Sequence, residues 1–412
     1  MSETPPQTGP LRGLRIVEFG HFIAAPFATR VLGDLGAEII KIEAPGTGDP
    51  VRGWGGQLED RSLWWSYHAR NKKSVSLNLK DPAARRIALD LVAASDAVIE
   101  NFRPGLMERF GLGPDALAEA KPGCVMVRVS GFGQTGPRAK EPSFGMIGEA
   151  LGGIRFLTGY PPEVTDLPPV RTGVSIGDSV AGLYGAIGLL AGLLEAKAHP
   201  PAPGTPARVV DVALTESVMS LLEGILPEYG ALGKIRQPAG ARLPAAAPSS
   251  AYPCQGGFIL IGANSDPLFA RLCQLMGREE LLSDPRFHDN PARVANIDAI
   301  DAIISEWTGP RPAVEVLAEL RKAGIPSCKI YSAADIVTDE QYKARNAVRA
   351  VPDPQHGQDI LQPAPIPRFP GENPEAIAWP GPAIGAHNEE IYGDLLGMDA
   401  ERLSALKAAG TI

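Results

Sequence analysis

Short apolar runs alternate with helical segments along the first 130 residues. The runs expected to form strands are rich in β-branched residues and lie at 14–19, 38–43, 97–101 and 125–130. Pro26 suits the first turn of a helix that extends towards Leu35, where Gly36 is a natural stop. Strands that alternate with helices predict βαβ units, and therefore a parallel sheet with helices on both faces.

The pattern changes in the second half of the chain. It predicts long helices at 145–157 and 180–194, a strand at 209–213 and a helix at 214–226. From Pro227 to Pro253 the composition shifts to Pro, Ala and Gly without clear periodicity. A smaller α+β unit follows, with a strand at 258–262 and helices at 266–276, 297–307 and 313–323, and a last helix is expected at 388–396.

Composition and charge exclude several classes of protein. The 412 residues carry a net charge of −8, which argues against nucleic acid as the main ligand. The longest uncharged apolar run, 180–194, has 15 residues, fewer than the roughly 20 that a membrane span needs, and is expected to be a buried helix. The N-terminal ten residues are polar, unlike a signal peptide. The cysteines lie far apart without a CxxC pair, which predicts a cytoplasmic α/β protein without disulfides or a metal site; they are Cys124, Cys254, Cys273 and Cys328.

Asp178 is the most informative single residue. It stands immediately before a long apolar stretch dense in Gly and Ala. Aspartate is among the commonest N-cap residues, so a structural role is one interpretation. The alternative is a nucleophile, because a helix N-terminus stabilises negative charge and its N–H groups can hold developing oxyanions. We expect Asp178 to be both.

Motifs along nearly the whole chain resemble the family III CoA-transferases, a group that includes formyl-CoA transferase and α-methylacyl-CoA racemase. The matching segments are in the family's order. They are 11–19 (LRGLRIVEF), 33–43 (GDLGAEIIKIE), 48–54 (GDPVRGW), 71–80 (NKKSVSLNLK), 100–105 (ENFRPG), 110–112 (FGL), 177–178 (GD), 284–287 (DPRF) and 385–388 (GAHN).

The resemblance implies a particular architecture. Residues 1–225 and 329–412 are expected to form a large Rossmann-like domain along which CoA lies. Residues 226–252 would be a linker and loop, and 253–328 a small α+β domain. Two such subunits are expected to interlock as a homodimer. The partners implied are an acyl-CoA thioester and a carboxylic acid, both as substrates, with no permanently bound cofactor.

The resemblance also assigns site residues. Asp178 matches the family nucleophile. His21, Phe22, Ile23 and Ala24 follow the first strand, where open α/β sheets bind ligands, and match the contacts to the thiol end and pantetheine arm; without the family, His21 is equally well a structural histidine. Lys72 and Lys73, expected to be an exposed pair, match a segment beside the CoA site, where one of them is expected to meet a phosphate. Asn101 and Phe102 match a CoA contact, and Arg109 matches an arginine near the nucleotide phosphates.

In the mechanism that the resemblance implies, Asp178 forms a mixed anhydride with the acyl group and then a thioester with CoA. The runner-up is an acyl-CoA racemase, which needs a base on each face of the α-carbon. Phe144 stands where that branch has a histidine. A CoA-binding protein without chemistry and a dehydrogenase are further alternatives, but the chain lacks the GxGxxG phosphate fingerprint of a dehydrogenase.

Segments 247–254 and 261–269 look like the branch that uses succinyl-CoA and dicarboxylic acceptors. The distal carboxylate of such an acceptor needs a cation, for which Arg155, Arg171 and Arg242 are candidates. Two departures from the family stand out. Ala44 replaces a common arginine, and segment 243–252 lacks the glycine run of the formyl-CoA transferase flap.

Overall fold

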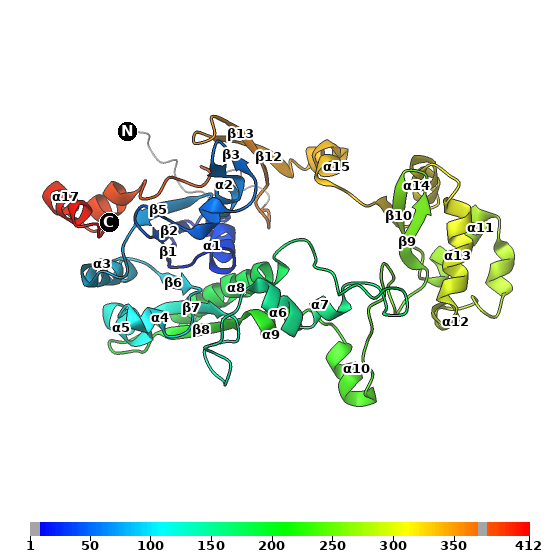
Figure 1. Cartoon of the computed structure of the whole chain (residues 1–412), viewed down its shortest axis with the longest axis horizontal. Coiled ribbons are helices and arrows are strands. Elements are labelled where there is room, and N and C mark those ends of the chain that lie inside the picture. The colour runs from blue at the N-terminus through cyan, green and yellow to red at the C-terminus, as the bar shows by residue number, and fades with distance from the viewer. Residues whose placement is uncertain (1–8, 370–376) are drawn as a thin grey trace. The chain divides into compact units, whose positions relative to one another are not determined.

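The computed structural model describes residues 9–369 and 377–412 (Figure 1). Its contacts group into two compact units. The large unit holds residues 1–155, 172–233 and 344–412, and the small unit holds 156–171 and 234–343. The domain ranges expected from the sequence stay a prediction, with these units as the observed grouping. The first eight residues, part of the polar N-terminal segment, lie outside the described residues.

A six-stranded sheet forms the centre of the large unit. All of its neighbouring strands pair in parallel, as the alternation of strands and helices predicts. The order across the sheet is β5-β2-β1-β6-β7-β8 (Figure 1). Its strands are β1 (Arg15–Glu18), β2 (Glu38–Glu43), β5 (Lys72–Ser76), β6 (Ala97–Glu100), β7 (Val125–Ser130) and β8 (Arg208–Ala213). Strand order reverses between β1 and β6, and the crevice at such a switch point is where open α/β sheets bind ligands.

Both faces of this sheet are covered. Successive strand residues point to opposite sides, so Ile16 joins one apolar cluster and Val17 the other. Helices α1 (Ala24–Asp34) and α8 (Ile176–Ala198) pack together on the Ile16 side. The Val17 side is covered by α3 (Pro82–Ala93), α5 (Pro114–Ala120) and α17 (Ala400–Ala408).

The predicted helix at 180–194 is longer than expected and only partly buried. It corresponds to α8, whose Ala181 and Leu189 are buried against the sheet. Ile187 and Leu194 on its other side are 60% and 69% exposed, so the expectation of a buried helix holds only for the side that faces the sheet. Among the described residues α8 alone is long and apolar enough for a membrane span, a test that core helices of soluble proteins also pass.

Several predicted helices are interrupted. The helix expected at 145–157 breaks at Gly152 and Gly153, and Gly153 has a φ of 90° that only glycine adopts readily. It becomes α6 (Gly145–Leu151) and α7 (Ile154–Leu157). The helix expected at 214–226 becomes α9 (Leu214–Met219) and α10 (Ile225–Leu232), and the one expected at 388–396 is a π-helix, η3 (Glu389–Leu395).

The small unit has its own sheet and core. Its antiparallel strands lie in the order β11-β10-β9, with bounds Ser327–Lys329, Gly257–Gly262 and Ser249–Cys254. Helices α11 (Asp266–Met276), α13 (Ile297–Thr308) and α14 (Ala313–Lys322) supply apolar residues to its core.

The remaining elements of the whole chain are short. They are η1 (Pro50–Gly53), β3 (Gln57–Leu58), β4 (Arg61–Ser62), α2 (Leu63–His68), α4 (Leu106–Arg109), η2 (Glu279–Ser283), α12 (Asn290–Ala295), α15 (Ala333–Thr338), α16 (Glu340–Ala344), β12 (Val348–Asp353) and β13 (Gln358–Pro363).

Four charged residues are buried in or beside strands β1, β2 and β5. We call Glu18, Lys41, Asp49 and Lys72 the charge quartet. Lys41 Nζ lies 2.6 Å from Glu18 and 2.8 Å from Asp49, and Lys72 Nζ lies 2.9 Å from Glu18. Burial alone would raise the pKa of Glu18, but the two lysines hold it below its ordinary value. Two positive and two negative charges balance, which is the condition under which ions are tolerated in a protein interior.

The charge quartet predicts that the loss of a buried cation lowers the stability of the protein far more than the loss of an exposed one. Replacing Lys41 with Met leaves two buried carboxylates without their shared cation, so we expect a loss of about 3–5 kcal/mol in the free energy of unfolding. Chemical denaturation followed by circular dichroism measures it. Arg86→Met is the matched control, because its pair with Asp90 is 85% exposed on the arginine side and is expected to contribute less than about 1 kcal/mol. Equal losses in the two variants would contradict the prediction.

Candidate active site

A pocket of about 320 Å³ opens at the switch point of the parallel sheet. It lies at the carboxyl ends of β1, β6 and β7, with further walls from the segment before α6 and from the beginnings of α8 and α9. The lining residues are His21, Phe22, Ala24, Asn101, Phe102, Arg103, Pro104, Leu106, Val129, Ser130, Gly131, Glu141, Ser143, Phe144, Asp178 and Leu214. This volume is at the small end of the range for ligand pockets, about 300–1,000 Å³, and suits the reacting end of a larger substrate.

The loop between β1 and α1 is fixed by polar groups beneath it. The Asn101 side chain accepts a hydrogen bond from the His21 N–H and donates one to the His21 carbonyl, both 2.8 Å long. Lys41 donates to the carbonyl of Gly20, and Asp49 accepts from the N–H of Phe22 at 3.1 Å. Phe22 has a φ of 62°, a left-handed conformation that is costly for an aromatic residue. These bonds hold the loop in its strained form.

His21 presents a neutral imidazole to the pocket. Burial lowers its pKa below the ordinary value, and the nearby Lys41 ammonium lowers it further, against the opposing effect of Asp49. Its ring meets Phe102 edge to face, with centroids 5.0 Å apart. At neutral pH this side chain therefore offers one hydrogen-bond donor and one acceptor.

Asp178 lies in the first turn of α8 rather than at its cap. The N-cap is Ser175, so the expectation that Asp178 is an N-cap is wrong. Its carboxylate lies against the beginning of α6. A Cβ added to Gly145 would be 1.9 Å from Asp178 Oδ2, and one added to Gly177 would be 2.8 Å from the Gly145 carbonyl oxygen. Two glycines thus allow α6 and α8 to meet backbone to backbone, and they leave room for the carboxylate.

A second carboxylate, which the sequence analysis missed, lies on the same helix as Gly145. Glu149 is one turn further along α6 and is 1% exposed. Its Cγ would be 3.4 Å from a Cβ at Gly177, and its Oε2 is 3.9 Å from an Arg155 nitrogen. Gly145 and Glu149 are four residues apart and therefore lie on the same face of α6. The sequence shows this spacing but does not show that this face meets α8.

The structure brings most, but not all, of the predicted binding residues together. His21, Phe22, Ala24, Asn101, Phe102 and Asp178 all line the pocket. Ile23 is 4% exposed and packs into a separate apolar cluster with Val51 and Trp65. Arg109 is exposed at the end of α4 and does not line the pocket. The roles of these residues in binding CoA stay predictions.

The expectation that Lys72 and Lys73 are exposed is wrong. They begin β5, a strand that the sequence analysis did not predict, and are 0% and 9% exposed. Lys72 donates to Glu18 and to the Pro26 carbonyl, and Lys73 pairs with Glu38 and Glu390 at 2.6 Å. Both ammonium groups are therefore held by protein partners, and the contacts lend no support to the predicted phosphate role.

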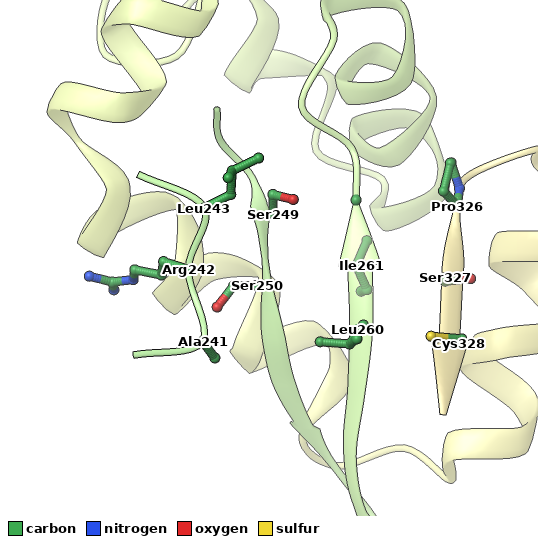
Figure 2. Close-up of a pocket in the computed structure, with 11 residues that line it drawn as sticks. Ala241, Arg242, Leu243, Ser249, Ser250, Leu260, Ile261, Pro326, Ser327 and Cys328 are labelled. Atoms are coloured by element: carbon green, nitrogen blue, oxygen red, sulfur yellow. The ribbon is translucent and has the colours of Figure 1, made fainter. Parts of the chain in front are cut away.

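None of the three arginines proposed for an acceptor carboxylate lines the pocket. Arg242 belongs to the small unit, where it pairs with Asp298 and Asp301 at 2.7 Å beside a groove of about 450 Å³ (Figure 2). In that view its side chain extends away from the β10 and β11 residues of the groove. The sequence analysis did not single out Arg103. Among the lysines and arginines of the described residues, it is the one that lines the Asp178 pocket.

Comparison with known proteins gives a consistent result. The sequence profile of CoA-transferase family III matches residues 11–388. The chain is 43% identical to the succinyl-CoA–D-citramalate CoA-transferase of Chloroflexus aurantiacus over the whole of both chains, and 37% identical to the succinyl-CoA–L-malate CoA-transferase alpha subunit of the same organism, over 97% of this chain and 92% of that one.

A solved structure agrees with the fold. The crystal structure of a CAIB/BAIF family protein from Brucella suis superposes with a TM-score of 0.81 at 31% identity, covering 94% of this chain and all of the other. The chain belongs to CoA-transferase family III.

Proposed function

We propose that this enzyme transfers CoA from succinyl-CoA, or a similar thioester, to a dicarboxylic acid, with Asp178 as the covalent carrier. The observation that carries the proposal is the placement of Asp178. Its carboxylate lines the pocket at the switch point and lies in a space that Gly145 leaves open. Relatives named for succinyl-CoA with citramalate, malate or glutarate support the choice of donor and of a dicarboxylate acceptor.

The proposed reaction runs through two anhydrides and one enzyme thioester. An Asp178 oxygen attacks the thioester carbonyl, and the CoA thiolate leaves to give an acyl–aspartyl anhydride. The thiolate then attacks the aspartyl carbonyl, which expels the donor acid and leaves an aspartyl-CoA thioester. The acceptor carboxylate repeats these two steps in reverse order and departs as the new acyl-CoA. Covalent catalysis of this kind divides one difficult transfer into easier steps, and bound substrate that displaces water from the pocket limits competing hydrolysis.

The residues around Asp178 hold the reacting groups rather than supply further covalent chemistry. Asn101 and Asp49 fix the loop that carries His21 and Phe22, and so fix one wall against which the thioester lies. We propose His21, Phe22, Ala24, Asn101 and Phe102 as contacts of the thiol end of CoA. Arg103 is our candidate for an anionic group of either substrate, because it is the cation on the pocket wall.

The alternative function, racemisation of an acyl-CoA, finds less support. Phe144 is 58% exposed on the pocket wall at the position where the racemase branch has a histidine. Proton abstraction from one face and delivery to the other needs two bases. A phenyl ring supplies neither.

We further propose that two chains form an interlocked homodimer. Helices α6, α8 and α9 pack on one another and expose many large apolar side chains, which we call the apolar surface. Its residues are Met146, Ile147, Leu151, Leu183, Tyr184, Ile187 and Met219, each between 36% and 60% exposed. Exposed apolar surfaces of this kind mark sites of protein association. Helix α8, which carries Asp178, contributes three of these residues.

The first test replaces the carrier. Asp178→Ala is expected to lower the rate of CoA transfer from succinyl-CoA to citramalate or malate by a factor of about 10³ or more. Mass spectrometry of protein quenched during turnover should show a CoA adduct on the wild-type peptide that contains Asp178, and none in the variant. Asp115→Ala is the control, because this exposed aspartate also lies in a first helical turn. Full activity in Asp178→Ala would refute the mechanism.

A second prediction concerns the space beside the carboxylate. Gly145→Ala places a methyl group where Asp178 Oδ2 lies, so we expect kcat to fall at least about 10-fold, since a displacement of about 1 Å at the reacting group can cost 10²-fold. Gly152→Ala is the matched control, because its methyl group would meet Val218 instead. If both variants lose stability but keep kcat, Gly145 has only a packing role.

The dimer is tested on the apolar surface. The wild-type chain is expected to elute at twice the chain mass in size-exclusion chromatography with light scattering. Ile187→Glu buries a charge in the proposed interface and is expected to produce monomer or aggregate. Val314→Glu alters an exposed apolar residue outside this surface, on α14, and should leave the mass unchanged. A monomeric wild-type protein would contradict the proposal.

A further inference from the structure

Ser130 is a buried polar residue in the wall of the Asp178 pocket. It ends β7, the strand next to β6 in the central sheet, and is 6% exposed. Its hydroxyl has no hydrogen-bond partner among the described residues, although it lines the pocket. Buried hydroxyls are nearly always hydrogen-bonded, because an unpaired one loses its bonds to water without replacement. Ser130 is therefore a group whose partner has to be sought in the pocket.

The polar neighbours of Ser130 in the wall are largely engaged with protein. The Asn101 amide is used on both sides by the His21 backbone. Glu141 accepts from Arg138 at 2.9 Å, and the Ser143 hydroxyl lies 3.4 Å from the Phe144 carbonyl. Alanine would fill the position of Ser130 equally well and would leave no unpaired group. The hydroxyl thus costs stability in the absence of a bound group, which indicates a role in binding.

The chemistry of the pocket identifies the bound group. An acyl carbon must come within reach of the Asp178 carboxylate to be attacked, and its oxygen then gains negative charge. The Asp178 carboxylate has no proton to donate to that oxygen. The Ser130 hydroxyl has one, and no protein group among the described residues accepts it. A donor held in place before the reaction stabilises the developing charge without reorganisation.

We propose that the Ser130 hydroxyl donates a hydrogen bond to the acyl oxygen of the substrate, meaning the thioester carbonyl oxygen of the acyl-CoA or a carboxylate oxygen of the acid. Ser130 forms no covalent bond in this role, and Asp178 remains the attacking group. The inference rests on the proposed transfer reaction and specifies how the same pocket recognises its substrate.

Equilibrium binding tests the proposal without turnover. In an Asp178→Asn background, which blocks the covalent step, affinities for succinyl-CoA and for free CoA are measured by isothermal titration calorimetry, with Ser130 intact or replaced by Ala. Free CoA has the same thiol arm but no acyl oxygen. We expect Ser130→Ala to weaken succinyl-CoA binding about 3- to 10-fold, the loss typical of one hydrogen bond, and to leave free CoA within twofold. An equal loss for both ligands, or a loss for neither, would overturn the proposal.

The thermal unfolding temperature distinguishes a binding role of Ser130 from a structural one, because the two roles predict changes of opposite sign in Ser130→Ala. Removal of an unpaired buried hydroxyl should raise the unfolding temperature of Ser130→Ala by about 1–3 °C, while kcat with Asp178 intact falls about 10- to 100-fold. Ser95→Ala is the matched control. Its hydroxyl is equally buried but donates to the Leu91 carbonyl at 2.7 Å, so it should lose stability and keep activity.

Ser130→Thr guards against a general effect of substitution, since it keeps the hydroxyl and should retain succinyl-CoA affinity to within about threefold. The test also separates this proposal from the proposed function. Transfer that survives Asp178→Ala refutes the carrier, whereas unchanged succinyl-CoA affinity in Ser130→Ala refutes only the hydrogen bond to the acyl oxygen.

Discussion

The charge quartet is the constraint on which the site depends. Glu18, Lys41, Asp49 and Lys72 come from β1, β2, the segment after β2 and β5, and each is at most 1% exposed. An interior ion is tolerated only when every charge has a partner, so the three strands must keep their mutual register. The same groups donate to the carbonyls of Gly20 and Pro26 and accept from Phe22. Sheet register and the shape of the loop between β1 and α1 are therefore set together.

Close contact between helix backbones determines where the Asp178 carboxylate lies in the pocket. Gly145 and Gly177 let α6 approach α8, and Gly182 does the same for α8 and α1, because a Cβ there would be 2.6 Å from the Ala24 carbonyl oxygen. Side chains of ordinary size would push the helices apart and move Asp178 away from the loop that carries His21. The density of Gly and Ala in α8 thus has a geometrical reason that its hydropathy does not reveal.

The sequence was informative where local pattern and buried apolar runs agree. The strands at 38–43 and 125–130 are those of β2 and β7, since β-branched Ile and Val residues favour a strand even where charged residues stand among them. The strand Lys72–Ser76 gave no such signal, because its two lysines are buried by ion pairing and not by hydrophobicity. The helix at 145–157 was overextended for a similar reason: its apolar residues continue through Gly152 and Gly153, but the backbone turns there.

The sequence by itself determined the alternation of most strands and helices in the large unit, the family, and the identity of Asp178 as the residue to examine, because each depends on residue types that are close together along the chain. Tertiary structure alone decided that Lys72 and Lys73 are enclosed, that Gly145 leaves room for the Asp178 carboxylate, that Glu149 lies against Gly177, and that Ser130 lines the same pocket as Asp178. These facts depend on distances between segments tens of residues apart, which local pattern does not encode. Only the packing of α6 and α8 against the sheet brings such groups within a few ångströms of one another.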